Sequence, residues 1–256
     1  IKEGEIFGFV GPNGAGKSTT IRTLLNFIFP TGGSGKILGM DIVKQSKDIK
    51  KQIGYVPSEV KFYDEIKVKD IIKYSCSFYD GINQEDVDKL YELLEVDVEK
   101  RMSELSLGNK KKVAIVQALI HKPRLLILDE PTASLNEDDS ENLLELMLEL
   151  KSQGITSILI SHKLNEVSKV CDSITVLRDG ASIETLDATG GKISEDRIVK
   201  GMVGRELTER YPKRTHKIGN VLFEVSNWNV YHPDYADRKM VDNVNIKVKK
   251  GEVLGI

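Results

Sequence analysis

The residues best suited to chemistry stand near the start of the chain, in a glycine-rich segment that ends in a lysine and two hydroxyl residues. The segment consists of Gly11, Pro12, Asn13, Gly14, Ala15, Gly16, Lys17, Ser18 and Thr19. It fits the pattern GxxxxGK[ST] and lies between an apolar stretch, residues 6–10, expected to be a strand, and a helical pattern over residues 17–28. In this setting the pattern is typical of a loop that binds the phosphates of a nucleotide.

Each residue type in this phosphate loop has a physical role. Glycines let successive backbone N–H groups turn toward phosphate oxygens, and the start of the following helix adds partial positive charge. Lys17 is expected to reach the β- and γ-phosphates of ATP, and the Ser18 hydroxyl is expected to bind Mg²⁺. A glycine-rich turn without a ligand is the alternative interpretation, and the intact strand–loop–helix context disfavours it.

Two adjacent carboxylates, Asp129 and Glu130, follow an unbroken apolar run, residues 125–128. Such a run is typical of a strand in a parallel sheet that is covered on both faces, and ligands bind beyond the carboxyl ends of such strands. We expect Asp129 to hold Mg²⁺, directly or through water, and Glu130 to orient and deprotonate the attacking water. The alternative is a pair of carboxylates that only solvate a loop.

His162 follows the next buried run, residues 155–160, and is therefore expected at the same sheet edge as Lys17 and Glu130. A lone histidine is more often structural, but the position at a strand end favours contact with the γ-phosphate. The phosphate loop, the carboxylate pair and His162 together indicate a P-loop enzyme that hydrolyses ATP.

The rest of the chain supplies the elements that must position these residues. Strands alternate with helical patterns, which predicts an α/β fold with a parallel sheet. The 256 residues carry a formal charge of −2, which gives no overall attraction to nucleic acid or anionic lipid. No apolar run approaches the roughly 20 residues that span a bilayer. Cys76 and Cys171 lie far apart, so neither a zinc site nor a disulfide framework is indicated.

A further motif narrows the class. Residues 105–109 read Leu-Ser-Leu-Gly-Asn and precede a helical pattern that leads to the Asp129–Glu130 strand. The segment resembles the signature of ATP-binding cassette (ABC) proteins, usually Leu-Ser-Gly-Gly-Gln. The resemblance implies an ABC cassette with a mainly parallel core sheet, an antiparallel β part and a helical subdomain inserted at about residues 63–107. It also implies that Ser106, Gly108 and Asn109 complete the site of an opposite cassette in a head-to-tail dimer.

The first half of the chain departs from the usual ABC pattern at several positions. Ser58 stands where the family usually has its Q-loop glutamine and is followed by Glu59, and Leu107 and Asn109 replace two signature residues. These substitutions resemble those of bacitracin-type drug-exporter ATPases, and we assign that likeness to residues 1 to about 130. They fall at positions that the resemblance links to sensing water and a transmembrane partner, and they leave the phosphate loop unchanged.

The second half resembles another subfamily. The segments 131–139, 160–166 and 201–206 are similar to the first cassette of tandem sugar-importer ATPases of the ribose and galactose type. One hypothesis is therefore a hybrid chain, natural or assembled, with a junction near the strand that ends in Asp129 and Glu130. Because those proteins carry two cassettes on one chain, a second cassette is expected as well.

The two ends of the chain support this expectation. Residues 248–256 repeat residues 1–9 with four identities and four exchanges of one apolar residue for another, which indicates an internal repeat of about one domain length. The expected organisation therefore has three parts: a cassette lacking its first strands (residues 1–186), a connector (187–220) and the start of a second cassette, truncated before its phosphate loop (221–256). ABC cassettes stack an aromatic residue on adenine, and Tyr231, or less favourably Trp228, stands at the corresponding distance before the missing second loop.

Three consecutive lysines, Lys110, Lys111 and Lys112, follow the signature segment. Such a run is compatible with nucleic-acid binding, but a solvated helix face is the favoured interpretation. No nucleic-acid partner is therefore expected.

The leading hypothesis is the ATPase subunit of an ABC transporter, peripheral on the cytoplasmic face of the cell membrane and acting on a transmembrane permease. Sugar import is favoured, with a substrate-binding protein as a further partner left open. The alternatives are a drug-export ATPase, a soluble ABC protein without a permease, and a module that binds nucleotide without hydrolysing it. Intact Glu130 and His162 argue against the last of these. The transported substrate cannot be read, because the permease selects it.

Overall fold

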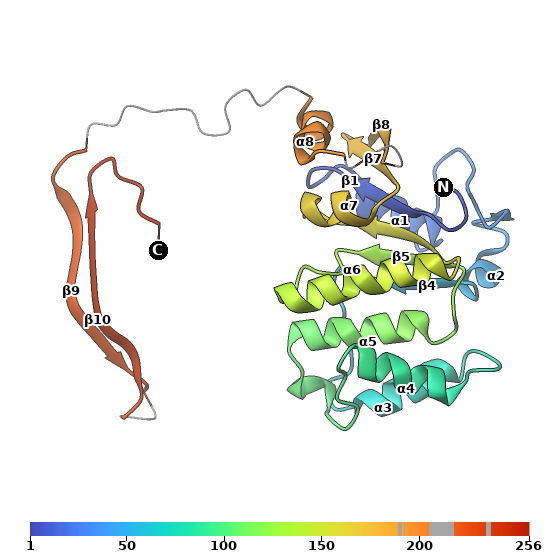
Figure 1. Ribbon diagram of the computed structural model, residues 1–256, viewed down its shortest axis with the longest axis horizontal. Helices are drawn as coiled ribbons and strands as arrows, with labels where there is room; N and C mark the ends of the chain where they lie inside the picture. The colour runs from blue at the N-terminus through green and yellow to red at the C-terminus, as the bar shows by residue number, and fades with distance from the viewer. Residues whose placement is uncertain (189–190, 192, 205–217, 234–236, 256) are drawn as a thin grey trace. The chain divides into compact units, whose positions relative to one another are not determined.

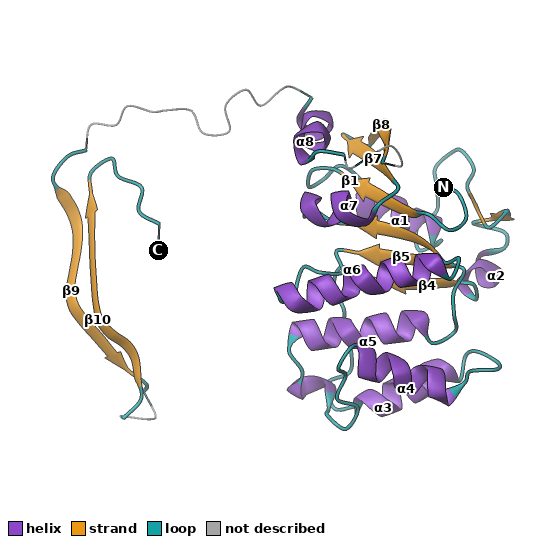
Figure 2. Cartoon of the chain, in the orientation of Figure 1, coloured by secondary structure: helices purple, strands orange, loops and turns teal. Residues whose placement is uncertain are grey.

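The computed structural model describes residues 1–188, 191, 193–204, 218–233 and 237–255. The chain divides into two compact units, Ile1–Glu206 and Leu207–Ile256. Figure 1 shows the elements of each unit, and Figure 2 distinguishes their helices and strands.

A six-stranded sheet forms the centre of the first unit, with the strand order β4-β5-β6-β1-β7-β8. The strands are β1 Ile6–Val10, β4 Ile53–Val56, β5 Leu125–Asp129, β6 Thr156–Ile160, β7 Ser173–Arg178 and β8 Ala181–Asp187. All neighbouring pairs are parallel except β7 and β8, which are antiparallel. The expected α/β fold with a mainly parallel sheet and an antiparallel part is confirmed.

Helices cover both faces of this sheet. They are α1 Lys17–Leu24, α2 Ser46–Lys50, α3 Val68–Cys76, α4 Gln84–Leu93, α5 Leu107–Leu119, α6 Glu137–Ser152, α7 Leu164–Val170 and α8 Glu195–Val203, with a 3₁₀ turn at Met102–Glu104. Successive strand residues alternate between the faces, as the pleat requires: Leu126 packs in the cluster of α3 to α7, and Ile127 in the cluster of α1 and α2. A small hairpin of β2 Lys36–Ile37 and β3 Met40–Asp41 borders the second cluster.

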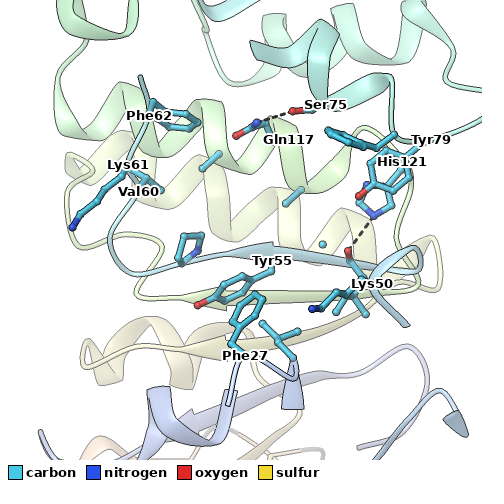
Figure 3. A pocket seen from close by; sticks show the side chains of 17 residues that line it. Phe27, Lys50, Tyr55, Val60, Lys61, Phe62, Ser75, Tyr79, Gln117 and His121 are labelled. Carbon is cyan, nitrogen blue, oxygen red and sulfur yellow. Dashed lines mark hydrogen bonds between the residues drawn. The ribbon is translucent and has the colours of Figure 1, made fainter. Parts of the chain in front are cut away.

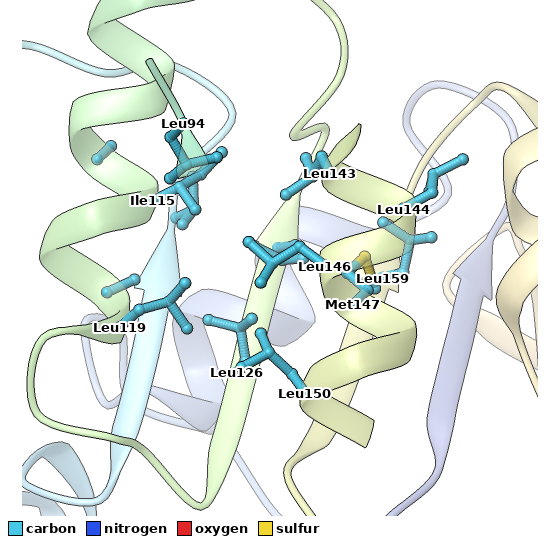
Figure 4. Close-up of a cluster of buried hydrophobic side chains, with 14 of the residues drawn as sticks. Leu94, Ile115, Leu119, Leu126, Leu143, Leu144, Leu146, Met147, Leu150 and Leu159 are labelled. Atoms are coloured by element: carbon cyan, nitrogen blue, oxygen red, sulfur yellow. The ribbon is translucent and has the colours of Figure 1, made fainter. Parts of the chain in front are cut away.

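The larger cluster fixes the helix that begins at residue 107. Figure 4 shows Leu119 of α5, Leu126 of β5 and Leu150 of α6 pointing toward one another. All are less than a tenth exposed, so α5 and α6 are held against the sheet by closely packed leucine and isoleucine side chains. Helices α3 and α4 lie beyond α5 in Figure 1, in the region expected to form the helical subdomain.

Local features set two helix boundaries. Helix α6 begins at Glu137, because the Asn136 side chain accepts a hydrogen bond of 2.7 Å from the Asp139 N–H and three acidic residues follow it. Helix α1 ends at Leu24 and not near residue 28, because Asn26 takes a left-handed conformation (φ 56°).

The second unit contains an antiparallel hairpin of β9 Val221–Tyr231 and β10 Lys239–Lys249. The register between the two strands shifts at several points. Across the residues that the structure describes, no helix is long and apolar enough to cross a membrane.

Candidate functional site

The phosphate loop connects the buried strand β1 to helix α1. Gly14 and Gly16 take positive φ angles of 81° and 101°, which side chains rarely adopt. Gly11 is required for a different reason: a Cβ there would lie 2.3 Å from the Leu177 carbonyl oxygen of β7. The Lys17 ammonium lies across the loop and donates to the carbonyl oxygens of Gly11 (2.7 Å) and Pro12 (3.1 Å). The Lys17 ammonium is therefore held against the backbone of the loop, where the motif requires a cation for phosphate binding.

The start of helix α1 suits an anion. Its N-cap residue, Gly16, provides no side chain to satisfy the first backbone N–H groups. Ser18 and Thr19 are exposed on the first turn, and no acidic residue stands there. Free N–H groups, hydroxyls and the ammonium of Lys17 are the donors that phosphate takes, so this set of groups fits the phosphates of ATP.

Asp129 ends β5 and is only 3% exposed. Burial raises its pKa, as does the neighbouring Glu130 charge, whereas the charges of Lys111 and Lys17 and a hydrogen bond with Ser58 lower it. Because β1 and β5 both pair in parallel with β6, the phosphate loop and the end of β5 lie at the same edge of the sheet. A buried carboxylate beside a second carboxylate gains from a nearby cation, so Asp129 and the Ser18 hydroxyl suit Mg²⁺ in donor type.

Glu130 follows Asp129 in a left-handed conformation (φ 49°), which costs a non-glycine residue about 1–2 kcal/mol. Its N–H donates to the Ile160 carbonyl oxygen of β6 (2.9 Å), which holds this turn of the chain. The carboxylate is thereby directed to the loop after β6, where Glu130 Oε2 and His162 Nδ1 lie 2.5 Å apart. The two residues expected to act in hydrolysis are thus in direct contact.

The signature segment forms the start of α5. The exposed Ser106 is the N-cap, and its hydroxyl accepts a hydrogen bond of 3.2 Å from the Asn109 N–H. Leu107 is 68% exposed, and Asn109 is exposed as well. Gly108 packs against the loop after Glu130, because a Cβ there would lie 2.7 Å from the Ser134 carbonyl oxygen. The signature therefore has an exposed edge and a face fixed to its own cassette.

The lysine run after the signature is not a solvated face, and that interpretation was wrong. Lys111 is 1% exposed and Lys112 6% exposed. Lys112 pairs with Asp139 of α6 at 2.6 Å. Lys111 donates to the carbonyl oxygens of Pro57 (2.7 Å), Ser58 (3.0 Å) and Asp129 (3.3 Å). Burial lowers the pKa of Lys111 to about 8, although the negative charges of Asp129 and Glu130 act to raise it.

Two further residues that the sequence pointed to are Glu59 and Tyr231. The exposed Glu59 carboxylate has an ion pair of 3.9 Å with Lys61, and only its neighbour Ser58 contacts Asp129. Tyr231 lies at the end of β9 in the second unit, 54% exposed, with the Lys239 ammonium 5.8 Å from its ring centre. Trp228 is 51% exposed on the same strand. The adenine contact of Tyr231 stays a prediction.

A parallel sheet with a phosphate loop after β1 and two carboxylates at the end of β5 defines the P-loop class of nucleotide-binding proteins. The ABC transporter family matches residues 1–133, and the chain belongs to this family. The solved structure of an ATP-binding subunit of an ABC transporter is similar over 81% of this chain and 86% of its own, with a TM-score of 0.68 and 29% identity. A dimeric bacterial ABC transporter cassette shares the fold, with a TM-score of 0.67 and 24% identity over 73% of this chain and 87% of its own.

Two curated relatives are similar over the whole chain. The L-arabinose transport ATP-binding protein AraG of Geobacillus stearothermophilus is 46% identical, and the xylose import ATP-binding protein XylG of Thermoanaerobacter pseudethanolicus is 39% identical. The chain spans about half the length of these relatives, 52% and 53%. Because the matches include residues 1–130, the likeness to sugar-import proteins extends through that segment, and its bacitracin-type likeness stays a prediction.

Proposed function

We propose that this chain is the ATP-binding and ATP-hydrolysing cassette of a transporter that imports a sugar. The observation that carries the proposal is the meeting of three groups at one edge of the sheet: the phosphate loop, Asp129, and the Glu130–His162 pair. Parallel strands place all three beyond their carboxyl ends, where such sheets bind ligands.

The chemistry assigned to each group follows from its surroundings. Lys17 and the N–H groups of the loop bind the phosphates, and Ser18 and Asp129 hold Mg²⁺, which would neutralise phosphate charge. Glu130 accepts the proton of the attacking water. Because an ionised carboxylate has no proton to donate, His162 Nδ1 carries the proton of the 2.5 Å contact and orients Glu130 Oε2.

A second cassette is proposed to complete the site. The exposed Ser106 and Asn109 at the start of α5 offer a hydroxyl and a helix N-terminus to the nucleotide of an opposite cassette. The head-to-tail dimer that the resemblance implies would place each nucleotide between the phosphate loop of one cassette and the signature of the other. The partner can be a second copy or a second cassette on the same chain, and the unit that contains Tyr231 is proposed to begin such a cassette after a connector at residues 187–220.

A permease is proposed to bind in the pocket beside Ser58. This pocket has a volume of about 370 Å³ and lies between β4, α3 and α5 (Figure 3). Apolar and aromatic side chains from several elements line it, among them Phe27, Tyr55, Val60, Phe62 and Tyr79. Since Pro57 also lines it, an occupant would press on the segment that contacts Asp129 and Lys111. The protein would thus lie on the cytoplasmic face of the membrane, held there by the permease.

Sugar uptake tests this proposal. Cells that lack the chain, cells that carry the wild type and cells that carry Glu130→Gln are compared for uptake of labelled L-arabinose and D-xylose, the sugars in the names of the relatives. We expect wild type alone to restore uptake of a sugar. Restored uptake by Glu130→Gln would contradict ATP-driven import, and lost drug resistance in place of lost uptake would favour export.

A further inference from the structure

A buried cluster of polar side chains lies directly behind the Glu130–His162 pair. Its centre is Glu166 of α7, which is 5% exposed, and its other buried members, Thr132 and Ser161, are each 1% exposed. Thr132 follows Glu130 by two residues, and Ser161 immediately precedes His162. The cluster therefore joins the two loops that carry the pair.

The Glu166 carboxylate receives hydrogen bonds from both loops. Thr132 Oγ1 donates to Glu166 Oε2 at 2.7 Å, and Ser161 Oγ donates to the same oxygen at 3.3 Å. Lys163 Nζ lies 3.1 Å from Oε1 and also donates to the Thr132 carbonyl oxygen at 3.2 Å. Both carboxylate oxygens thus have partners, which is what a buried charge requires.

We infer that Glu166 is a positioning residue for ATP hydrolysis, holding the Glu130 and His162 loops at the separation that their 2.5 Å contact needs. The inference rests on the proposed function. The His162 side chain is 61% exposed, so packing does not fix it and its position depends on the backbone at Ser161. Glu130 is in a left-handed conformation that the surrounding structure must maintain.

The loss of this cluster is expected to act on the chemical step and not on nucleotide binding. None of its hydrogen bonds reaches the phosphate loop, so the KM for ATP is set by other groups. A misplacement of about 1 Å at a reacting group can lower a rate about a hundredfold. Glu166→Ala is therefore expected to lower kcat by about tenfold or more, since smaller displacements cost less than the full hundredfold. The KM for ATP is expected to change by less than about twofold.

Two variants separate positioning from charge and from folding. Glu166→Gln keeps a carbonyl oxygen that can accept from Thr132 and Ser161, and it is expected to retain kcat within about threefold. Thr132→Val keeps the side-chain volume and removes one hydroxyl. It replaces Glu166→Ala in these measurements if Glu166→Ala does not fold. The matched control is Glu141→Ala, which removes an exposed carboxylate of α6 that pairs with Lys169 of α7, and its kcat should equal that of wild type.

The deciding measurement is a double-mutant cycle on kcat with His162→Ala in the purified protein. If Glu166 acts through the pair, Glu166→Ala lowers kcat in wild type but not further in the His162→Ala background. Two results would overturn this inference and leave the proposed function standing. One is a fall in kcat by the same factor in both backgrounds. The other is a Glu166→Gln variant with a kcat as low as that of Glu166→Ala. A wild type no faster than Glu130→Gln would overturn the proposed function, and the inference with it.

Discussion

The Glu130 carboxylate and the His162 ring are joined by a 2.5 Å hydrogen bond, although 32 positions separate them in the chain. The contact follows from sheet topology, because β5 and β6 are adjacent parallel strands with Asp129 opposite Ile160. Each residue stands just beyond the end of its strand. The register of these strands brings the two loops together, and Glu166 behind the pair bridges the same two loops.

Lys111 links the signature helix to the loop at Ser58 and to the end of β5, and its removal should destabilise the cassette. Lys111→Ala removes the ammonium that donates to three carbonyl oxygens, one of them in a buried contact, and creates a cavity, so we expect a loss of about 2–4 kcal/mol in the free energy of unfolding. Lys110→Ala is the matched control. Its ammonium makes a 3.5 Å ion pair with the exposed Asp64, worth at most about 1 kcal/mol. Equal losses in urea unfolding would contradict this role.

Gly108 should not accept a side chain. A Cβ would lie 2.7 Å from the Ser134 carbonyl oxygen, and this backbone atom can move only with the loop after Glu130. Gly108→Ala is expected to cost about 1–3 kcal/mol of unfolding free energy. Gly32→Ala, where nothing lies within 4 Å of the added Cβ, should change it by less than about 0.5 kcal/mol. A melting temperature for Gly108→Ala equal to that of Gly32→Ala would be evidence against the contact.

His121 should make the fold sensitive to acid. Its Nε2 bonds with the Ile53 carbonyl oxygen (3.1 Å), its Nδ1 is buried without a partner among the described residues, and its ring stacks on Tyr79 (Figure 3). Burial lowers the His121 pKa. Because the folded pKa lies below the unfolded value of about 6.5, this contribution to stability is full above that value and is lost as the pH falls through the folded pKa.

The measurement is the free energy of unfolding at pH 7.5 and pH 5.5 for wild type and His121→Gln. We expect wild type to lose more stability than the variant between these two values, since glutamine does not titrate. The same pH dependence in both proteins would show that His121 is not the sensitive group.

The strands and the positions of the candidate site residues could be predicted from the sequence because both depend on local pattern. Apolar runs such as residues 125–128 indicate buried parallel strands, and parallel strands bring their carboxyl ends to one edge whatever the intervening chain. This reasoning alone led to Glu130 and His162, and the structure brings them into contact.

The buried polar contacts could not be predicted in this way. Lys111 and Glu166 are charged residues whose burial depends on partners distant in the chain, such as the Pro57 carbonyl oxygen and the Thr132 hydroxyl. Hydrophobic periodicity counts such residues as solvent-facing, and the run of three lysines reinforced that error. One signal was present: Lys111 occupies an interior position of a helix whose other residues are mostly apolar.

ATP hydrolysis with Glu130 as the base is tested most directly by phosphate release from wild type and Glu130→Gln at saturating ATP and Mg²⁺. Glutamine preserves the shape of the side chain but cannot take a proton, so we predict a kcat lower by about a hundredfold or more, with ATP still bound. Lys17→Ala in the same assay should lose nucleotide binding itself, which separates the two steps. Equal and negligible phosphate release by wild type and Glu130→Gln would contradict the assignment of this chain as an ATPase.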